Sequence, residues 1–145
     1  MYITLETDYA VRIVHTLVRA KAQPPAKNGG GAASRRSCLD AGTISQRTGV
    51  PVRFALKILR KLVSGGIVRS YKGVYGGYEL CAQPSELTLY DVVSLIEGDY
   101  LFSRCLEADY GCDCSQPCSY RKAFGEVSEM VQDFLKRQTF DKLAE

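Results

Sequence analysis

The sequence predicts a mainly α-helical fold with a small β-wing, a winged helix-turn-helix that leads into a long C-terminal helix. Three observations predict it. Two helical segments are joined by a short turn at 49–51, two β-prone runs separated by glycines follow directly, and an apolar stripe continues for about five helical turns near the C-terminus. With 145 residues, 46% hydrophobic and 24% charged, the chain is long enough to bury one core.

Composition excludes several classes of protein. No apolar run approaches the roughly 18 to 20 residues that cross a bilayer, and the N-terminal segment carries Glu6, Asp8 and Arg12 where a secretory signal needs an apolar stretch. We therefore expect a cytoplasmic protein with no membrane partner. In that reducing compartment the six cysteines favour a metal site over structural disulfides. The formal net charge of +3 is too small to identify a nucleic-acid partner by itself.

Residues 7–21 predict an amphipathic helix with Thr7 as its N-cap. The apolar residues that recur at helical spacing are Ala10, Ile13, Val14, Leu17 and Val18. The single histidine, His15, lies on the polar face with Asp8, and we interpret it as a solvated side chain rather than a metal ligand. Residues 22–37 contain two prolines and three consecutive glycines without apolar periodicity, and they predict a flexible surface loop.

The helix-turn-helix is expected between Asp40 and Gly65. Asp40 is the N-cap of a short helix that ends at Gly49, and a second helix covers 52–64. The buried stripe of the second helix is expected to contain Ala55, Ile58, Leu59 and Leu62. Its candidate recognition face, which would contact DNA, carries Arg53, Leu56, Lys57 and Arg60.

The wing is predicted from β-prone runs at 67–71 and 77–80, with turn-forming glycines between them. Lys72 and Tyr75 lie at its tip and are further candidate DNA contacts. Residues 87–98 then predict a short helix that ends at Gly98. Its largely buried residues are expected to be Val92, Val93, Leu95 and Ile96.

From Tyr120 onward the pattern is helical again. The apolar stripe consists of Phe124, Val127, Met130, Val131, Phe134 and Leu135. A stripe of this length at the end of a small domain needs a partner to bury it, and a second copy of the same helix is an economical one. We therefore expect a homodimer, with folding of the helix back onto its own domain as the alternative.

A cysteine-rich segment separates these parts. Cys105, Cys112, Cys114 and Cys118 lie in a stretch bent by Gly111 and Pro117, which indicates a metal or iron–sulfur site. The predicted organisation is a winged-helix DNA-binding domain over 1–98, a cluster-binding loop over 99–119, and a dimerisation helix and tail over 120–145.

Several motifs in this order resemble the Rrf2 family of winged-helix regulators, which includes the IscR, NsrR and CymR types. They are T-D-Y-A-V-R at 7–12, the helix-turn-helix, S-Y-K-G-V-Y-G-G-Y-E-L at 70–80, L-T-L-Y-D-V-V-S-L-I-E-G at 87–98, and the cysteine segment before a long helix. The resemblance, nearest to the NsrR-like cluster-binding members, implies a homodimeric transcription factor without catalytic activity. It implies binding to double-stranded DNA at a palindromic operator, and sensing of redox state, nitric oxide or iron–sulfur status.

The resemblance also implies a ligand set. Cys105, Cys112 and Cys118 fit the three cysteines of cluster-binding members, and a 2Fe-2S cluster is expected rather than 4Fe-4S. The histidine that completes the cluster in the iron–sulfur regulators is replaced by Arg121 here. In the nitric-oxide sensors an aspartate from the first helix of the partner subunit completes it, and Asp8 matches that position. Cys114 is the other candidate fourth ligand.

Two alternatives stay open. The four cysteines of the segment suit a structural zinc site, in which case the protein is a regulator without redox sensing. A cluster-free regulator whose thiols respond directly to oxidants is the second. Cys38 and Cys81 are interpreted as core or idle thiols, and no arrangement of residues typical of an enzyme is present in the sequence.

Overall fold

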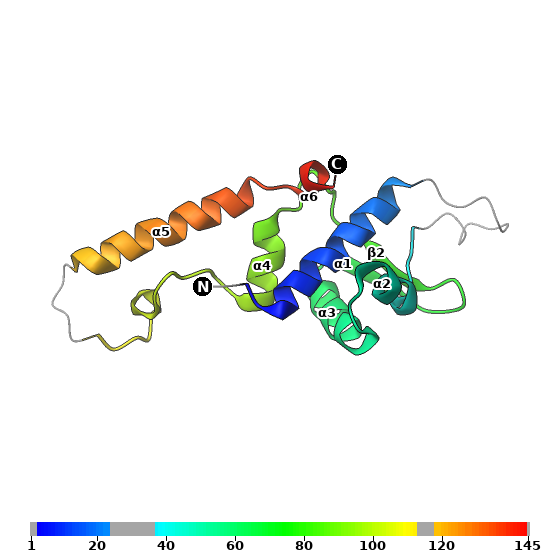
Figure 1. Ribbon diagram of the computed structural model, residues 1–145, viewed down its shortest axis with the longest axis horizontal. Helices are drawn as coiled ribbons and strands as arrows, with labels where there is room; N and C mark the ends of the chain where they lie inside the picture. The colour runs from blue at the N-terminus through cyan, green and yellow to red at the C-terminus, as the bar shows by residue number, and fades with distance from the viewer. Residues whose placement is uncertain (1–2, 24–36, 113–117, 145) are drawn as a thin grey trace.

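The computed structural model describes residues 3–23, 37–112 and 118–144. A helical domain with a two-stranded wing carries an arm, formed by α5 (Ser119–Lys136) and the segment that precedes it, which projects from the domain (Figure 1). The predicted fold class is confirmed. Most of the loop predicted at 22–37 lies outside the described residues. In the described part of the chain, no helix combines the length and the apolar character needed to cross a bilayer.

The first helix, α1 (Leu5–Ala22), runs through the centre of the domain and contacts α2, α3, α4 and β2. Its predicted apolar residues are all buried. The prediction that Thr7 is the N-cap is wrong, because Thr4 caps the helix and Thr7 is buried within it. Glu97 explains the difference: its Oε1 accepts hydrogen bonds from Thr4 N at 2.8 Å, from Thr4 Oγ1 at 3.0 Å and from Thr7 Oγ1.

The helix-turn-helix consists of α2 (Ala41–Thr48) and α3 (Val52–Ser64), as predicted. Asp40 caps α2 by accepting a hydrogen bond from Thr43 N at 3.0 Å. Gly49 ends α2 in the left-handed region with a φ of 72°, which disfavours any residue with a side chain. The predicted stripe of α3 is buried in the core, and this fixes which side of α3 faces solvent.

The wing is an antiparallel pair of strands, β1 (Val68–Tyr71) and β2 (Gly77–Leu80), with Val68 opposite Leu80. Leu39 adds a bridge on the other edge of β2, where it exchanges backbone hydrogen bonds with Tyr78. A Cβ atom at Gly77 would lie 2.7 Å from the Leu39 carbonyl oxygen, so this close approach requires glycine. The wing is thereby anchored to the strand-like residue that leads into α2.

The C-terminal tail returns to the helical domain. After α5, the residues around Thr139 pair with those around Thr88, the N-cap of α4 (Leu89–Glu97), and α6 (Phe140–Leu143) follows. Phe140 N donates to Leu87 O at 2.9 Å, and the Phe140 side chain is 1% exposed. Sequence patterns grouped this tail with the C-terminal helix. The structure shows that Phe140 belongs to the core of the winged helix.

Candidate nucleic-acid interface and cysteine site

The candidate recognition face lies on the side of α3 opposite its buried stripe. Arg53, Lys57 and Arg60 are exposed there, and Leu56 is half-buried. Successive residues of a helix are rotated by about 100°, so Arg53 and Arg60, seven positions apart, lie above one another near the middle of this face. The basic face is therefore exposed to solvent in the single chain.

One carboxylate of α1 reaches this surface. Glu6 Oε1 lies 2.8 Å from Lys61 Nζ, and Glu6 Oε2 lies 3.3 Å from Lys57 Nζ. The contact with Lys61 holds the pKa of Glu6 below its ordinary value, although burial acts in the opposite direction. Lys57, a predicted DNA contact, thus shares a carboxylate with a second lysine of α3. Sequence reasoning missed this contact because Glu6 and Lys57 are 51 positions apart.

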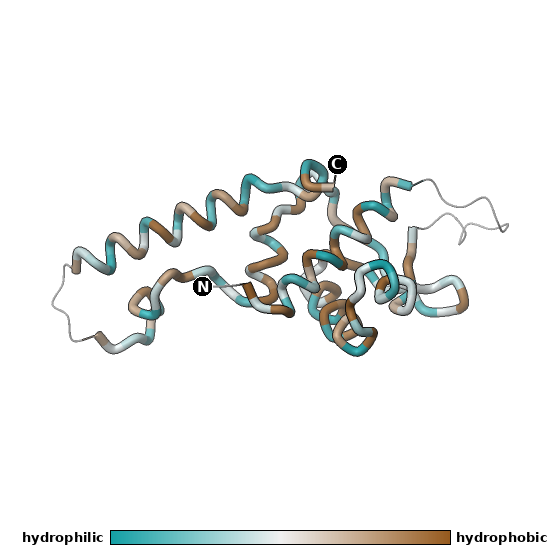
Figure 2. Tube along the Cα trace, in the orientation of Figure 1, coloured by the Kyte–Doolittle hydropathy of each residue, from teal (hydrophilic) through white to brown (hydrophobic). Residues whose placement is uncertain are grey.

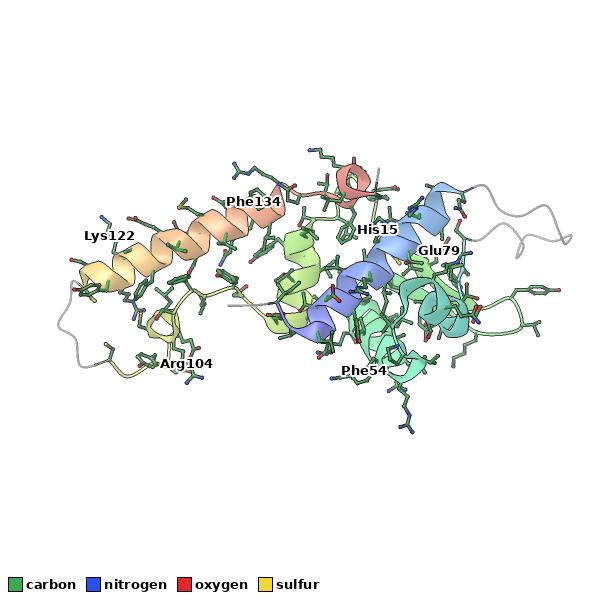
Figure 3. All side chains as sticks on the ribbon, viewed as in Figure 1. His15, Phe54, Glu79, Arg104, Lys122 and Phe134 are labelled. Carbon is green, nitrogen blue, oxygen red and sulfur yellow. The ribbon has the colours of Figure 1, made fainter. Side chains whose placement is uncertain are left out.

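An aromatic pair extends the surface at the N-terminal end of α3. The Phe54 ring packs edge-on against Tyr9 of α1, with 6.2 Å between ring centroids, and Phe54 remains 52% exposed (Figure 3). The recognition face therefore borders an apolar contact surface as well as a basic one. The sequence signal for this part of the surface was Phe54, an aromatic residue directly after Arg53. The apolar periodicity of α3 did not identify Phe54 as exposed.

The wing tip is exposed as predicted. Lys72 and Tyr75 lie in the turn between the strands, and Tyr75 is 76% exposed. Gly76 N donates to Gly73 O at 2.9 Å, which closes the turn and directs the tip away from the domain. Val74, which is 96% exposed at the same tip, was not among the predicted contacts.

Three of the four cysteines predicted as metal ligands are described. Cys105 lies half-buried in the 3-10 helix η2 (Arg104–Leu106), Cys112 is exposed, and Cys118 is the half-buried N-cap of α5, where its Sγ accepts a hydrogen bond from Arg121 N at 3.5 Å. Cys114 lies outside the described residues. Within the parts of the chain that the structure describes, no three or more acidic, histidine or cysteine side chains are grouped closely enough to hold a metal. Cys105, Cys112 and Cys118 therefore do not form a closed three-thiol site within the described residues of one chain.

The segment before the cysteines is fixed along α5. Phe102 N donates to Ser128 Oγ at 2.9 Å, and the Phe102 ring lies 5.5 Å from that of Phe124. Gln132 Nε2 donates to Tyr100 O at 3.0 Å. Ser128 is 3% exposed, and the hydrogen bond from Phe102 N gives its buried hydroxyl oxygen a partner. Residues 100–106 and α5 thus form one arm, with Cys118 at its outer end.

Among the described residues, Asp8 forms no metal-binding group with Cys105, Cys112 or Cys118. It is on the exposed side of α1, where its Oδ2 pairs with Arg12 Nη2 at 2.9 Å. The 18-residue α5 is about 27 Å long, and it carries the outer end of the arm away from α1 (Figure 1).

The apolar stripe of α5 is only partly covered. Phe124, Val127, Val131 and Leu135 are half-buried, whereas Met130 is 71% and Phe134 56% exposed. Hydrophobic and hydrophilic residues alternate along the projecting helix (Figure 2), and Phe134 lies close to its inner end (Figure 3). This arm leaves large apolar side chains in contact with solvent in the single chain.

The remaining candidates lie in the helical domain. Cys38 is half-buried and Cys81 is exposed, so Cys81 is not a core thiol. His15 is half-buried and lines a cavity beside Phe140, which differs from the solvated side chain that was predicted. The C-terminal tail accounts for this difference, since α6 packs beside the polar face of α1.

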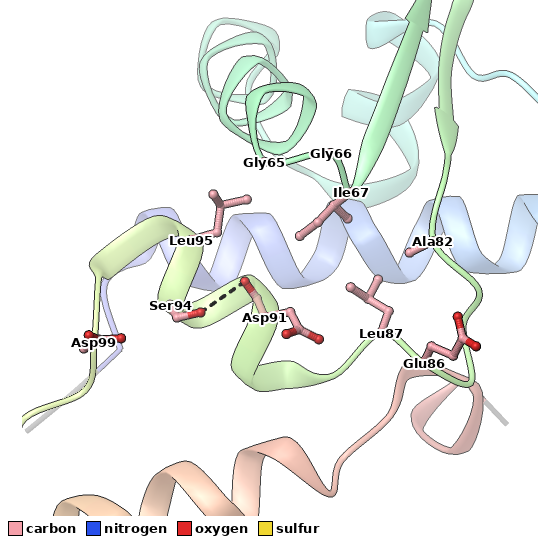
Figure 4. A pocket seen from close by; sticks show the side chains of 10 residues that line it. All are labelled: Gly65, Gly66, Ile67, Ala82, Glu86, Leu87, Asp91, Ser94, Leu95 and Asp99. Atoms are coloured by element: carbon pink, nitrogen blue, oxygen red, sulfur yellow. Dashed lines mark hydrogen bonds between the residues drawn. The ribbon is translucent and has the colours of Figure 1, made fainter.

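A larger cavity of about 560 Å³ lies between the end of α3 and α4 (Figure 4). Its rim carries Glu86, Asp91 and Asp99, so its charge disfavours phosphate. Asp91 already completes the capping box of α4 with Thr88, and Asp99 accepts a hydrogen bond from Tyr90. This cavity is therefore distinct in character from the basic face of α3.

Comparisons with known proteins agree with this architecture. The family model described as Rrf2, iron-dependent transcriptional regulator, matches residues 3–145. A protein of Rhizobium meliloti named aau3 is 28% identical over 144 residues, which cover 99% of this chain and 84% of that protein. The HTH-type transcriptional regulator IscR of Pectobacterium carotovorum is 28% identical over 100 residues, 69% of this chain and 60% of the regulator. The structure of CymR, the global cysteine regulator of B. subtilis, superimposes with a TM-score of 0.73 at 20% identity, over 99% of this chain and 96% of CymR.

Proposed function

Because the chain belongs to the Rrf2 family of transcriptional regulators, we propose that it acts as a homodimer whose affinity for a palindromic operator is set by an iron–sulfur cluster on its cysteine segment. The signal is redox state, nitric oxide or iron–sulfur status. The observation that carries the proposal is the arm: Cys105 lies in a segment fixed to α5, Cys118 caps the outer end of α5, and the other end of α5 is joined to the winged helix.

DNA recognition is assigned to α3 and the wing. Arg53 and Arg60, exposed opposite the buried stripe, would reach base edges or phosphates in the major groove. Leu56 offers an apolar contact for a thymine methyl group. Lys72 and Tyr75 at the exposed wing tip would contact the adjacent minor groove, where a narrow A·T-rich stretch attracts a cation.

Dimerisation is assigned to the apolar side of α5. Met130 and Phe134 are the most exposed of its predicted apolar residues, and burying large apolar side chains is the main driving force for association. Two arms packed against each other would carry each cysteine segment toward the other subunit. A palindromic operator then follows from the two-fold symmetry of the dimer.

The donor set fits an iron–sulfur cluster. Cys105, Cys112 and Cys118 are soft thiol ligands that form no disulfide, and each is at least partly exposed to solvent. Cys118 also caps α5, where the helix dipole favours a negatively charged group. Asp8 of the partner subunit or Cys114 would supply the fourth ligand. When bound, a 2Fe-2S cluster supplies a redox-active centre that oxidants and nitric oxide attack.

Contacts within the chain link the cysteine segment to the DNA-binding helices. At the inner end of α5, Lys136 Nζ lies 4.8 Å above the Tyr90 ring of α4. At the end of α4, Glu97 accepts hydrogen bonds from Thr7 of α1 and from Thr4, the N-cap of α1. Since α1 packs on α3, a rearrangement of the cysteine segment has a continuous path to the recognition helix.

Operator binding by matched cysteine variants tests the proposal. The affinity of anaerobically isolated protein for a selected operator would be measured by fluorescence anisotropy before and after nitric oxide, together with Cys112→Ser and Cys81→Ser. Cys81 is exposed but lies outside the cysteine segment at 105–118, so its variant is the control. We expect nitric oxide and Cys112→Ser to change affinity by about tenfold or more, and the control not to. An unchanged affinity in both cases would overturn the proposed sensing.

The DNA assignment has its own test. Replacing Arg53 and Lys57 with alanine should abolish operator binding, because each removes a cation from the recognition face, while sedimentation still reports a dimer. Operator binding at the level of the unchanged protein would remove α3 from the interface.

A further inference from the structure

We propose that the cavity between α1, α2, α4 and α6 binds a small organic carboxylate with a short hydrocarbon chain. The cavity measures about 340 Å³, within the range of small-molecule sites. Its walls come from the helix-turn-helix on one side, and from the C-terminal tail and the start of α4 on the other.

The floor of the cavity is apolar. Phe140 is 1% exposed and joins the core, and Val11 and Leu89 pack against that core beside it. A hydrocarbon chain placed on this floor would leave water without displacing any polar group. The floor therefore selects a ligand with an apolar part of several carbon atoms, and free phosphate has no such part.

The rim of the cavity is cationic. Arg12, His15 and Arg47 line it, and the only ion pair that any of them forms in the described part of the chain is that of Arg12 with Asp8. Within the same part, Arg47 and His15 have no hydrogen-bond or ion-pair partner among the side chains. His15 of α1 lines the cavity together with Phe140 and Leu143 of α6.

The two rim hydroxyls do not compete for an anion. Thr16 Oγ1 donates to Arg12 O at 2.9 Å, and Thr48 Oγ1 donates to Ile44 O at 2.7 Å. The donors left for a ligand are therefore the cationic groups, and a guanidinium matches a carboxylate with two parallel hydrogen bonds. An amine would meet like charges at the same rim.

Arg12 connects this cavity to Asp8. A carboxylate that reaches Arg12 competes with Asp8 for the guanidinium, so occupancy of the cavity would change the availability of Asp8 as a cluster ligand. That connection to sensing rests on the proposed function. Binding in the cavity does not, because it uses neither the cysteines nor DNA.

Titration of the full-length protein with hexanoate, hexylamine and inorganic phosphate, followed by calorimetry and by NMR, tests the proposal. We expect saturable binding of hexanoate alone at millimolar concentration, with chemical-shift changes at residues that line the cavity. Arg47→Ala should weaken it by about tenfold or more, the loss expected for a charge-assisted contact. Arg19→Ala is the matched control, because Arg19 is an exposed arginine of α1 outside the cavity.

Three results would overturn the proposal. They are the absence of saturable hexanoate binding, equal binding of hexylamine or phosphate, and an unchanged affinity in an Arg47→Ala protein whose circular dichroism shows it to be folded. Since none of these measurements involves operator DNA or the cluster, a failure here is distinguishable from a failure of the proposed sensing.

Discussion

Replacing Glu6 with glutamine should weaken the fold slightly and strengthen non-specific DNA binding. Glu6 contacts Lys57 and Lys61, whose side chains are 60% and 38% exposed, while that of Glu6 is 26% exposed. Ion pairs at this exposure contribute about 0.2–1 kcal/mol each, so Glu6→Gln should lower the free energy of unfolding by about 1 kcal/mol. The two lysines would then be available to phosphates.

The expected change in the salt dependence of DNA binding follows from counterion release. Each additional phosphate contact steepens the slope of log affinity against log salt by about 0.9, so one freed lysine adds about 0.9 and two add about 1.8. The assay is fluorescence anisotropy on a non-specific duplex over a series of salt concentrations. Glu129→Gln is the control, since Glu129 is an exposed carboxylate on α5 and its loss changes the net charge equally.

A steeper slope for Glu6→Gln than for Glu129→Gln is the expected result. Weaker DNA binding by Glu6→Gln with an unchanged or shallower slope would contradict this prediction, because Glu6 would then hold the lysines in place for DNA rather than compete with it.

Three further predictions follow from the fold. Phe140→Ala should lower the free energy of unfolding by about 3–5 kcal/mol in a urea titration, since the ring is buried, and a loss below about 1 kcal/mol would show that the tail is not docked. Burial raises the pKa of Glu97, but hydrogen bonds from Thr7 and Thr4 outweigh it and hold the pKa below its ordinary value of 4.5. The stability that Glu97 contributes is therefore present above about pH 4.5 and lost as the pH falls through its folded pKa. Glu97→Gln should flatten the unfolding free energy over that acid range, and an unaltered pH profile would count against this linkage. Phe134→Asp should convert the dimer to a monomer in sedimentation, because it places a charge on the apolar side of α5, and a persisting dimer would exclude that interface.

The helix-turn-helix could be predicted because its signals are local. The bounds of α3, Val52–Ser64, match the prediction, because the turn at Gly49 precedes and Gly65 follows a segment with a clear helical spacing of apolar residues. The N-cap of α1 could not be assigned in the same way. Thr4 and Thr7 are both plausible caps, and the choice depends on Glu97, which lies 93 positions from Thr4.

The docking of the C-terminal tail and the contacts of Glu6 could not be predicted for the same reason, because they depend on residues far apart in the sequence. The two apolar residues of the four-residue α6, Phe140 and Leu143, are too few to define a helical period, and the burial of Phe140 depends on pairing with residues near Leu87. Glu6 and its lysines, too, meet only after folding. For the cysteine site, the ligand roles of Cys105, Cys112 and Cys118 stay a prediction that rests on the resemblance to cluster-binding regulators. In the proposed cluster site, no local pattern decides whether Asp8 of a second copy or Cys114 supplies the fourth ligand.

The visible absorption spectrum of anaerobically isolated protein, together with its iron, sulfide and zinc content, tests the central claim most directly. We expect a coloured protein with iron and sulfide in equal amounts, whose visible absorption is lost in Cys112→Ser and kept in Cys81→Ser. Colourless protein that contains zinc without iron or sulfide would contradict the proposed cluster and assign the cysteines to a structural metal site.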